Sequence, residues 1–562
     1  MSLTLARIVS AGALAAALFA ASPASAQPPA SSWGDEELAG GDEAQEGETD
    51  EAPAARRPRG RPRIEVTPYV ELNAGVSADL SNDDVLTYSS VAAGVDARVE
   101  TRRVQAQASY RYERRIAIDG DGGEDDVHSG IAMIHAEAVP GVSLDAGAMA
   151  TRSGGAGRGT NVTPFDDSTQ VYSAYAGPTV NTNVGPVQIG ASYRIGYVHV
   201  DDDGLAGDGT DGRYNDSTAH NATASVGMSA GGRLPFGWTV GGGYVREEAG
   251  ELENRFEASY LRGDLVVPVG PTLALTGGVG YEDISSSSMD IVRNAAGVPV
   301  LVNGRLVADP TRPRVQGFDT SGVIFDGGII WRPSPRTELQ ARAGRRYGGT
   351  TVTGSLSHRF NSRYGMSASV YDSIGTFGTA LVNNISSLPA NATIDRNPLT
   401  GNISSCVYGR DPGTGVCFDQ ALQSLSGQAY RGRGANLSFS GTAGLYSFGL
   451  GAGYSHRRYI QPVSGDMSSL DPRVDQSVGV SAGLSRRLGR FAGASLDLSA
   501  SWYDSDRPLF EPVMSQSATF SFHRSFLLER LRFNAALGIY HTDGMFYDST
   551  VLSAIIGLSY TF

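Results

Sequence analysis

The last twelve residues of the chain, Val551 to Phe562, alternate between two kinds of side chain. The odd positions are mostly small or polar, and the chain ends on an aromatic residue. The even positions are all apolar, namely Leu552, Ala554, Ile556, Leu558, Tyr560 and Phe562. A period of two is typical of a β-strand whose two faces meet unlike surroundings. The end of the chain is therefore predicted to be a strand with one apolar face.

The same alternation recurs through the chain, for example in Val104–Tyr112, Val187–Tyr197 and Tyr446–Tyr454. In the first two segments the opposite face carries Arg111 and Arg194. An arginine facing lipid in the middle of a bilayer costs about 2–4 kcal/mol, so the polar face must point inward and the apolar face outward. The pattern predicts a closed barrel with a polar inside.

Composition narrows the class of protein. The 562 residues contain no apolar run of about 20 after residue 26, which excludes a membrane protein built from helices. A mean hydropathy of −0.18 fits a barrel, because its apolar residues occupy alternate positions. The net charge of −14 excludes a nucleic-acid-binding protein.

The N-terminal segment divides into two parts. Residues 1–26 are predicted to be a cleaved signal peptide, with Arg7 before an apolar core and Ala24-Ser25-Ala26 at the cleavage site. Residues 27–63 are first acidic and then rich in Arg and Pro, and they carry too few apolar residues to fold. They are predicted to form a disordered periplasmic tail, either a passive spacer or a contact with peptidoglycan or a periplasmic partner.

Residues 64–562 are predicted to form an all-β, transmembrane, antiparallel up-and-down barrel of about 22 strands, with 18 or 20 as alternatives. The strands are expected near 64–79, 84–99, 102–117, 126–139, 142–152, 168–184, 186–201, 216–232, 236–249, 255–269, 271–285, 318–333, 336–348, 350–361, 363–377, 427–441, 444–459, 473–489, 492–504, 514–527, 531–542 and 547–562. Short connections such as Pro140-Gly141 and Gly185-Pro186 alternate with longer ones. Barrels of this kind have short periplasmic turns, which predicts that both termini are periplasmic.

The inward face is expected to carry charged residues that line the lumen. They are Glu65, Glu71, Asp96, Arg98, Arg103, Arg111, Glu113, Arg194, Glu338, Arg342, Arg346, Asp497 and Arg532. Opposed charges across a lumen orient polar solutes and set ion selectivity. The alternative is that these residues pair with one another and only fill the barrel.

Two connections, Ile284–Gly317 and Thr376–Gln428, are too long to be simple turns. The second contains the only cysteines, Cys406 and Cys417, which are predicted to form a disulfide in an outer loop, because an exported chain meets an oxidising compartment. It also holds apolar residues, which a solvated loop has little reason to carry: Leu381, Val382, Ile385, Leu388 and Ile394. This segment is therefore predicted to fold over or into the lumen and to limit passage.

Several runs resemble a family of outer-membrane β-barrel proteins of sphingomonad-type alphaproteobacteria, related to β-barrel porins. The runs are Val66–Glu71, Asp84–Ser89, Val104–Glu113, Val171–Pro178 and Trp331–Leu339. The final strand, with Tyr560 and Phe562, also resembles the signal that outer-membrane barrels present to their assembly machinery. Members are sometimes labelled preprotein translocase subunit YajC, but that label implies a small protein with one spanning helix, which this sequence does not match.

The resemblance and the pattern together predict an outer-membrane protein that is a porin-like channel for small polar solutes. Export of a polysaccharide or another polymer and a structural role without transport remain alternatives. A TonB-dependent receptor is disfavoured because 37 residues are too few for its N-terminal plug. An enzyme is less favoured, since no His falls in a hydrolase or metal motif and no catalytic residue, metal ligand or cofactor can be named. The expected partners are outer-membrane lipid, lipopolysaccharide and the assembly machinery, with no nucleic acid.

Overall fold

The structure is a computed structural model of the chain, and it shows a sheet of 22 strands that closes on itself. It describes residues 63–120, 124–154, 162–163, 168–201, 216–250, 252–298, 300–302, 305–388, 392, 394–404, 406–409, 411, 413–423, 425–460, 474–506, 511–527, 530–544 and 548–562. The predicted signal peptide and all of the tail but its last residue lie outside this range. Within it, no helix is long and apolar enough to cross a membrane.

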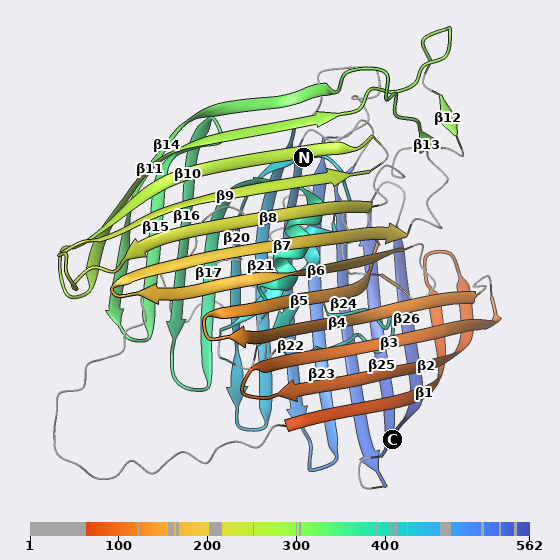
Figure 1. Cartoon of the computed structure of the whole chain (residues 1–562). Coiled ribbons are helices and arrows are strands. Elements are labelled where there is room, and N and C mark those ends of the chain that lie inside the picture. Colours follow the sequence, from red (N-terminus) through yellow and green to blue (C-terminus); the bar gives the residue numbers. More distant parts are fainter. Residues whose placement is uncertain are drawn as a thin grey trace, which may run out of the picture.

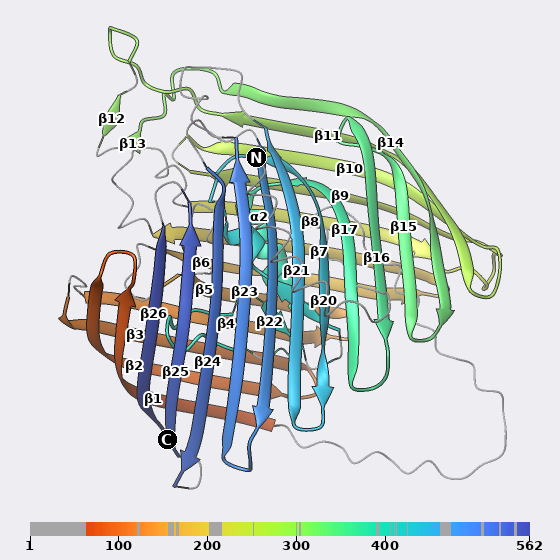
Figure 2. The same cartoon turned by 180° about the vertical axis from the view of Figure 1, so that it is seen from behind.

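The first half of the wall alternates direction from strand to strand. Its strands are β1 (Arg63–Asp79), β2 (Asp84–Glu100), β3 (Val104–Asp119), β4 (Glu124–Val139), β5 (Val142–Ser153), β6 (Thr169–Val184), β7 (Val187–Asp201), β8 (Asp216–Met228), β9 (Gly237–Ala249), β10 (Asn254–Pro268) and β11 (Leu273–Ser288). Each pairs with its neighbour in the sequence in antiparallel register, as Figures 1 and 2 show. This is the up-and-down order that the sequence predicts.

The second half continues in the same way. Its strands are β14 (Val315–Ser334), β15 (Thr337–Arg346), β16 (Gly349–Arg359), β17 (Tyr364–Gly375), β20 (Tyr430–Ala443), β21 (Tyr446–Tyr459), β22 (Val474–Arg487), β23 (Ala492–Ser505), β24 (Val513–Phe526), β25 (Leu531–Asp543) and β26 (Ser549–Thr561). The last strand pairs with β1, from Tyr69↔Thr561 to Asp79↔Val551, which closes the barrel. The prediction of 22 strands is confirmed, and the alternatives of 18 and 20 are not.

The two ends of the barrel differ in their connections. At the end that holds Phe562, here called the turn end, the connections have two to eight residues. At the opposite loop end they range from two residues between β15 and β16 to 54 between β17 and β20. The two-residue turn at the loop end is possible because Tyr347 and Gly348 adopt φ angles of 53° and 71°, which suit a tight hairpin.

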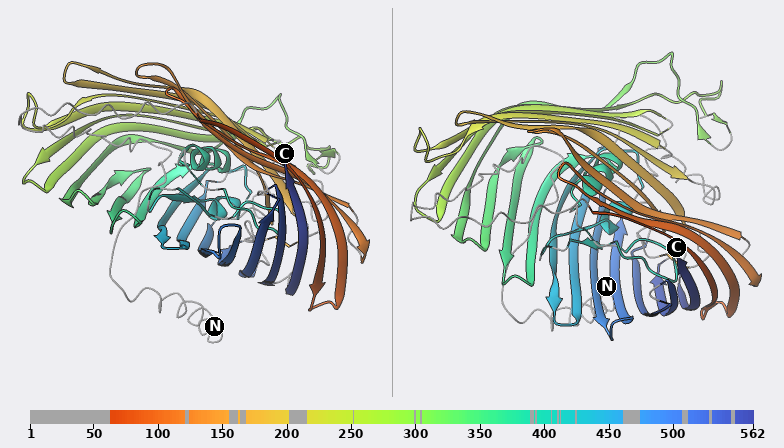
Figure 3. Two further views of the ribbon diagram at one scale, coloured as in Figure 1. Left: turned by 90° about the horizontal axis from the view of Figure 1, so that it is seen from below. Right: turned by 60° about the horizontal axis from the view of Figure 1, so that its bottom comes forward.

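The loop between β11 and β14 carries the short strands β12 (Leu301–Val302) and β13 (Arg305–Leu306), and it extends away from the wall (Figures 1 and 2). The segment between β17 and β20 instead folds inside the barrel, where the helix α2 (Phe377–Ser386) is seen within the ring of strands (Figure 3). Its other elements are β18 (Cys406–Tyr408), β19 (Gly415–Cys417) and α3 (Asp419–Leu422).

The outward face of the wall is apolar. On β26 the even residues, such as Ile556 and Leu558, are exposed on the outside, whereas Val551 and Ile555 on the inner face are buried. Aromatic side chains gather near both ends of the strands. Near the turn end Phe360, Tyr364, Phe439 and Phe448 contact one another, and nearer the loop end Tyr110, Tyr112, His128, Tyr172 and His199 do so. Rings that are half apolar and half wet suit the two interfaces of a membrane.

Candidate functional site

The segment 376–429, here called the insert, lies in the lumen and packs one apolar face against the wall. Buried side chains of α2, among them Leu381, Val382 and Ile385, share one core with inward-facing residues of β4 to β9. Those wall residues, here called the docking wall, are Ile131, Met149, Val171, Tyr175, Val198, Val200 and Ala249. The sequence predicted a polar inside, and along the docking wall that prediction is wrong. These inward positions are apolar because the insert covers them.

Glycines on the wall let the helix approach closely. A Cβ atom at Gly196 of β7 would lie 2.6 Å from Cγ2 of Val382, and one at Gly147 of β5 would lie 3.1 Å from Cγ2 of Ile385. Both glycines stand at inward positions of their strands. The wall is therefore shaped to receive α2 in one position.

The N-terminus of α2 is fixed by a carboxylate on the wall. Glu247 of β9 is fully buried, and it accepts hydrogen bonds from the Thr376 hydroxyl, the Thr379 hydroxyl and the Thr379 amide, the last at 2.7 Å. A negative charge at this end of a helix is favoured by the helix dipole and by the unpaired amides of the first turn. At Gly378 a Cβ would lie 2.6 Å from Oε1 of Glu247, so the first turn needs a glycine there.

Polar contacts hold the middle of the insert to β3, β4 and β5. The guanidinium of Arg396 donates to the Ser109 carbonyl at 2.9 Å and to the hydroxyls of Ser109 and Ser129 at 2.8 and 3.1 Å. The Asn402 side chain accepts from the Arg152 amide and donates to the Arg152 carbonyl, both at 2.9 Å. These contacts satisfy polar groups that burial would otherwise leave without partners.

Other contacts reach β2, β25 and β26, and one reaches β20 across the barrel. Asn397 donates to the Tyr540 hydroxyl at 2.9 Å, and Leu399 packs among Tyr88, Tyr540 and Ile555. The backbone amide of Gly413 donates to the Ser440 hydroxyl at 3.1 Å. Because β3–β5 and β20–β25 are both engaged, the insert crosses the lumen, as the sequence predicts.

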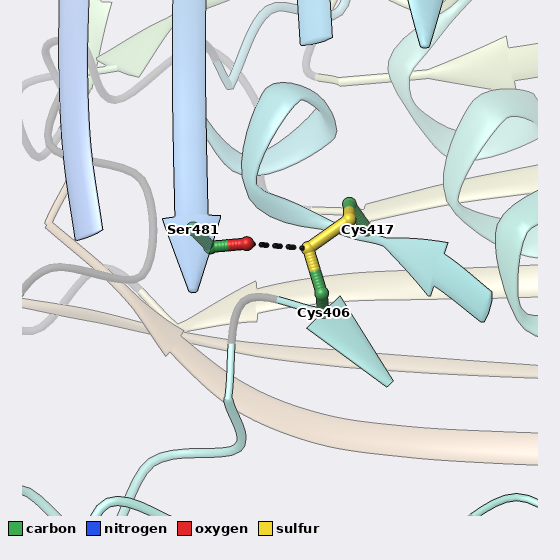
Figure 4. Close-up of a disulfide and its surroundings, with 3 residues drawn as sticks. All are labelled: Cys406, Cys417 and Ser481. Atoms are coloured by element: carbon green, nitrogen blue, oxygen red, sulfur yellow. Dashed lines mark hydrogen bonds between the residues drawn. A yellow bond between two sulfur atoms is a disulfide. The ribbon is translucent and has the colours of Figure 1, made fainter. Parts of the chain in front are cut away.

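The disulfide between Cys406 and Cys417 is present and joins β18 to β19 (Figure 4). The predicted pairing is thus confirmed, but the bond lies against the inner wall rather than in a loop outside the barrel. The Cys406 sulfur is 3.1 Å from the Ser481 hydroxyl, and a Cβ at Gly451 would lie about as close to both sulfurs. Next to it, burial raises the pKa of Tyr408 to about 12. The disulfide stiffens the part of the insert that rests on β21 and β22.

A cluster of four charges occupies the inner face further round the barrel, on β10, β14 and β15. Arg262 lies 2.9 Å from Asp326, and Arg342 lies 2.8 Å from Asp264 and 3.3 Å from Asp326. Arg262 also binds Asp264 of its own strand. We call these four residues the charged wall. Gly278 of β11 leaves room for them, since a Cβ there would lie 2.2 Å from the Arg262 side chain.

Sequence reasoning found Arg342 but missed Arg262, Asp264 and Asp326. Arg262 and Asp264 lie in the strand predicted near 255–269. The signal that was present is their spacing, because residues two apart in a strand share a face. Nearer the loop end, Arg346 lies 3.5 Å from Glu282, and its guanidinium stands over the rings of Tyr260 and Tyr347.

A second charge network lies beneath the insert. Arg111 lies 2.9 Å from Glu71 and 2.8 Å from Glu113, and Arg115 lies 2.9 Å from Glu113. Gly401 of the insert rests on this group, since a Cβ there would lie 2.9 Å from both Arg111 and Glu113. Glu71, Arg111 and Glu113 were predicted to line the lumen, and the structure brings them together at the foot of the insert.

The remaining predicted lumen residues do not join either cluster. Their places are as follows: Glu65 pairs with Arg63, Asp96 accepts from Ser109, Arg98 pairs with Glu100, Arg103 is exposed in the turn after β2, Arg194 is half-buried, Glu338 pairs with Arg332, Asp497 accepts from Ser495, and Arg532 is exposed at the turn end. In the described part of the chain, no three His, Cys, Asp or Glu residues are grouped so as to hold a metal ion.

Comparisons with known proteins find likeness only among solved structures. No protein-family model and no curated protein matches the chain. The FrpB iron transporter from Neisseria meningitidis is similar over 88% of this chain and 82% of its own, with 12% identity and a TM-score of 0.43. The BauA ferric preacinetobactin receptor from Acinetobacter baumannii is similar over 89% and 81%, with 10% identity and a TM-score of 0.43.

The alcaligin outer-membrane receptor FauA from Bordetella pertussis is similar over 89% of this chain and 76% of its own, with 11% identity and a TM-score of 0.37. None of these comparisons supports the sphingomonad family, which stays a prediction, or the YajC label.

Proposed function

We propose that the chain is an outer-membrane channel for small polar solutes, in which the insert narrows the lumen and the charged wall lines the remaining path. The insert is the observation that carries this proposal, because it crosses a closed barrel from β3–β5 to β20–β25. A barrel of 22 strands needs something to fill it if the membrane is to stay a barrier.

The outer surface supports the membrane location. On β21 the outward residues Tyr446, Phe448, Leu450, Ala452 and Tyr454 form an uninterrupted apolar row. From Tyr446 to Tyr454 is eight residues, about 26 Å along a strand. This matches the apolar band of about 25 Å that outer-membrane barrels present to lipid.

The charged wall supports the choice of solute. Its two arginines and two aspartates balance, so it presents both signs of charge over a short distance rather than a field of one sign. The four side chains pair with one another and are 6–20% exposed, which is also what the alternative of charges that only fill the barrel expects. Such a wall orients dipolar solutes and does not exclude either ion. Export of a wide polymer is a less favoured function, since the polymer would have to pass the insert.

Excising the insert tests the proposal directly. Gly375 and Tyr430 are paired across β17 and β20, so residues 376–429 can be replaced by the two-residue turn Asn-Gly without changing the register. In planar bilayers the variant should show a single-channel conductance several times that of the full chain. A control that removes residues 293–307 from the loop between β11 and β14 should leave conductance unchanged.

The proposal fails if the excised variant folds, as judged by its heat-modifiable mobility, and conducts like the full chain. It also fails if neither protein conducts, in which case the insert fills a barrel that has no transport role.

A further inference from the structure

Outside the lumen, the outward face of β20 and β21 changes character toward the loop end. On β20 the outward residues run from Phe439 through Leu437 and Ala435 to Arg433 and Arg431. On β21 they run through Leu450, Ala452 and Tyr454 to His456 and Arg458. The intervening residues of both strands are buried on the inside, which fixes these directions.

The arginines lie just beyond the aromatic residues at the loop end. Tyr454 is paired with Ala435 of β20 and with Val478 of β22, and Val478 is paired with Trp502 of β23. Arg433 is one outward position beyond Ala435, and Arg458 is two beyond Tyr454. Successive outward positions are about 7 Å apart along a strand, so these guanidinium groups stand at the level of lipid headgroups.

One carboxylate organises two of the three arginines. Asp372 of β17 is buried and accepts from Arg431 at 2.8 Å and from Arg433 at 3.0 Å. Both arginines also donate to the Thr350 carbonyl at 2.9 Å. The Arg433 side chain nevertheless stays 50% exposed. Arg431 is 18% exposed and also donates to the Tyr347 carbonyl at 3.4 Å, so Arg433 presents most of the accessible guanidinium of the pair. Held in this way, the Arg433 guanidinium loses little freedom when it binds a further anion.

The third arginine differs from the other two. Arg458 is exposed and makes no ion pair with any described residue. Elsewhere on the outward face at the loop end, Arg114 pairs with Glu124 and Asp126, and Arg255 pairs with Glu248. Arg431, Arg433 and Arg458, here called the arginine patch, therefore carry an excess of positive charge over Asp372.

We propose that the arginine patch binds phosphate groups carried by an anionic glycolipid of the outer leaflet. Planar guanidinium groups bind phosphate oxygens through paired hydrogen bonds, and the headgroup level of the leaflet is where such phosphates lie. The chain contains no lysine. All three residues of the patch are arginines, each of which can donate two parallel N–H bonds to a phosphate. This inference rests on the membrane location in the proposed function and on the predicted orientation, in which the termini are periplasmic and the loop end faces the cell exterior, but it does not rest on conduction.

Binding of lipid A to the purified full-length barrel in detergent tests it. The variant R431Q/R433Q/R458Q removes the patch. The control R486Q/R490Q/R524Q removes as many arginines at the turn end, where they stand over Tyr446, Phe491 and Phe526. We expect diphosphoryl lipid A to bind the patch variant at least tenfold more weakly than the wild type, and the control within twofold of it.

Three other probes identify the source of the phosphate. Dephosphorylated lipid A should bind the wild type and the patch variant equally, and neither phosphatidylglycerol nor inorganic phosphate should approach the affinity of diphosphoryl lipid A. Equal binding of diphosphoryl lipid A by the two proteins overturns the proposal. The proposal is also overturned if phosphatidylglycerol or inorganic phosphate binds the wild type as tightly as diphosphoryl lipid A does. Both variants should keep wild-type conductance, so failure here is distinct from failure of the channel.

Discussion

The docking wall and the charged wall are parts of one barrel, built from the same kind of strand, yet their inner faces are opposites. On the docking wall the inward residues include Val171, Val198 and Val200, whereas on the charged wall they include Arg262 and Asp326. The outward faces of both are apolar. The difference shows that what an inward position carries depends on what covers it. Under α2 the inward residues are mostly apolar, and where the insert does cover charged residues, as at Glu247 and Glu113, each of them has partners.

The largest effect is expected from a charge placed in the insert where it meets the docking wall, since this tests whether that wall must be covered by apolar side chains. Leu381 is fully buried there, and Leu381→Asp would leave an uncompensated charge against Val198 and Val200. We expect docking to weaken by about 3 kcal/mol or more, since a buried charge without a partner costs at least that much. Single-channel conductance should rise, and protease should cut within the insert.

Leu381→Met is the matched control, because it keeps the volume and costs less than about 1.5 kcal/mol. Wild-type conductance and protease resistance in the aspartate variant would show that α2 does not depend on the docking wall.

Removing the carboxylate that holds α2 should have the next largest effect. Glu247→Ala removes a buried acceptor from the hydroxyls of Thr376 and Thr379 and from the Thr379 amide, which keeps only its longer contact of 3.4 Å to the Thr376 hydroxyl. Such a loss costs about 1–3 kcal/mol. Amide hydrogen exchange should quicken in α2 while the strands of the barrel keep their protection. Uniformly faster exchange in the strands as well would mean that Glu247 supports the wall rather than the helix.

On the charged wall a substitution should change selectivity and leave the insert in place. Asp326→Asn removes one negative charge from a balanced group of four, so Arg262 and Arg342 are left in excess. The zero-current potential across a salt gradient should shift toward anion selectivity. Asp504→Asn is the control, because this aspartate points outward near the loop end. An unchanged zero-current potential in Asp326→Asn would show that ions do not pass the charged wall.

The smallest effect should come from a buried acid within the insert. Burial raises the pKa of Asp395. An acid whose pKa is higher in the folded state stabilises that state below its unfolded pKa, and the contribution is lost as pH rises through the folded pKa. After correction for the intrinsic exchange rate, the protection of the insert should therefore fall as the pH rises through the raised pKa of Asp395, and Asp395→Asn should flatten that dependence. A slope that persists in the asparagine variant would assign it to another group.

The strands could be predicted because alternation and connection lengths are properties of short stretches. The alternation within Val104–Tyr112 and Val551–Phe562 is enough to predict a strand and its outward face, whatever the rest of the chain does. The insert was likewise predicted from its length and from residues such as Leu381 and Ile385. What could not be predicted is which wall receives it.

The alternation of β7 makes Val198 and Val200 inward, but they are buried only through contact with a segment nearly 200 positions later in the chain. Arg262 and Asp264 likewise gain their role from Asp326 and Arg342, which lie on two other strands. A single sequence shows which residues share a face of one strand, but not which distant residues that face meets.

The pairing of Gly375 with Tyr430 bears on how such a barrel could arise. Both ends of the insert emerge from one ordinary antiparallel pair, so its gain or loss in a single genetic event would leave the wall with the same strands in the same order. The wall and the insert can thus be inherited as separate modules. The docking wall is tied to the insert most closely, because without it the inward valines and Ile131 would be apolar side chains facing an open lumen.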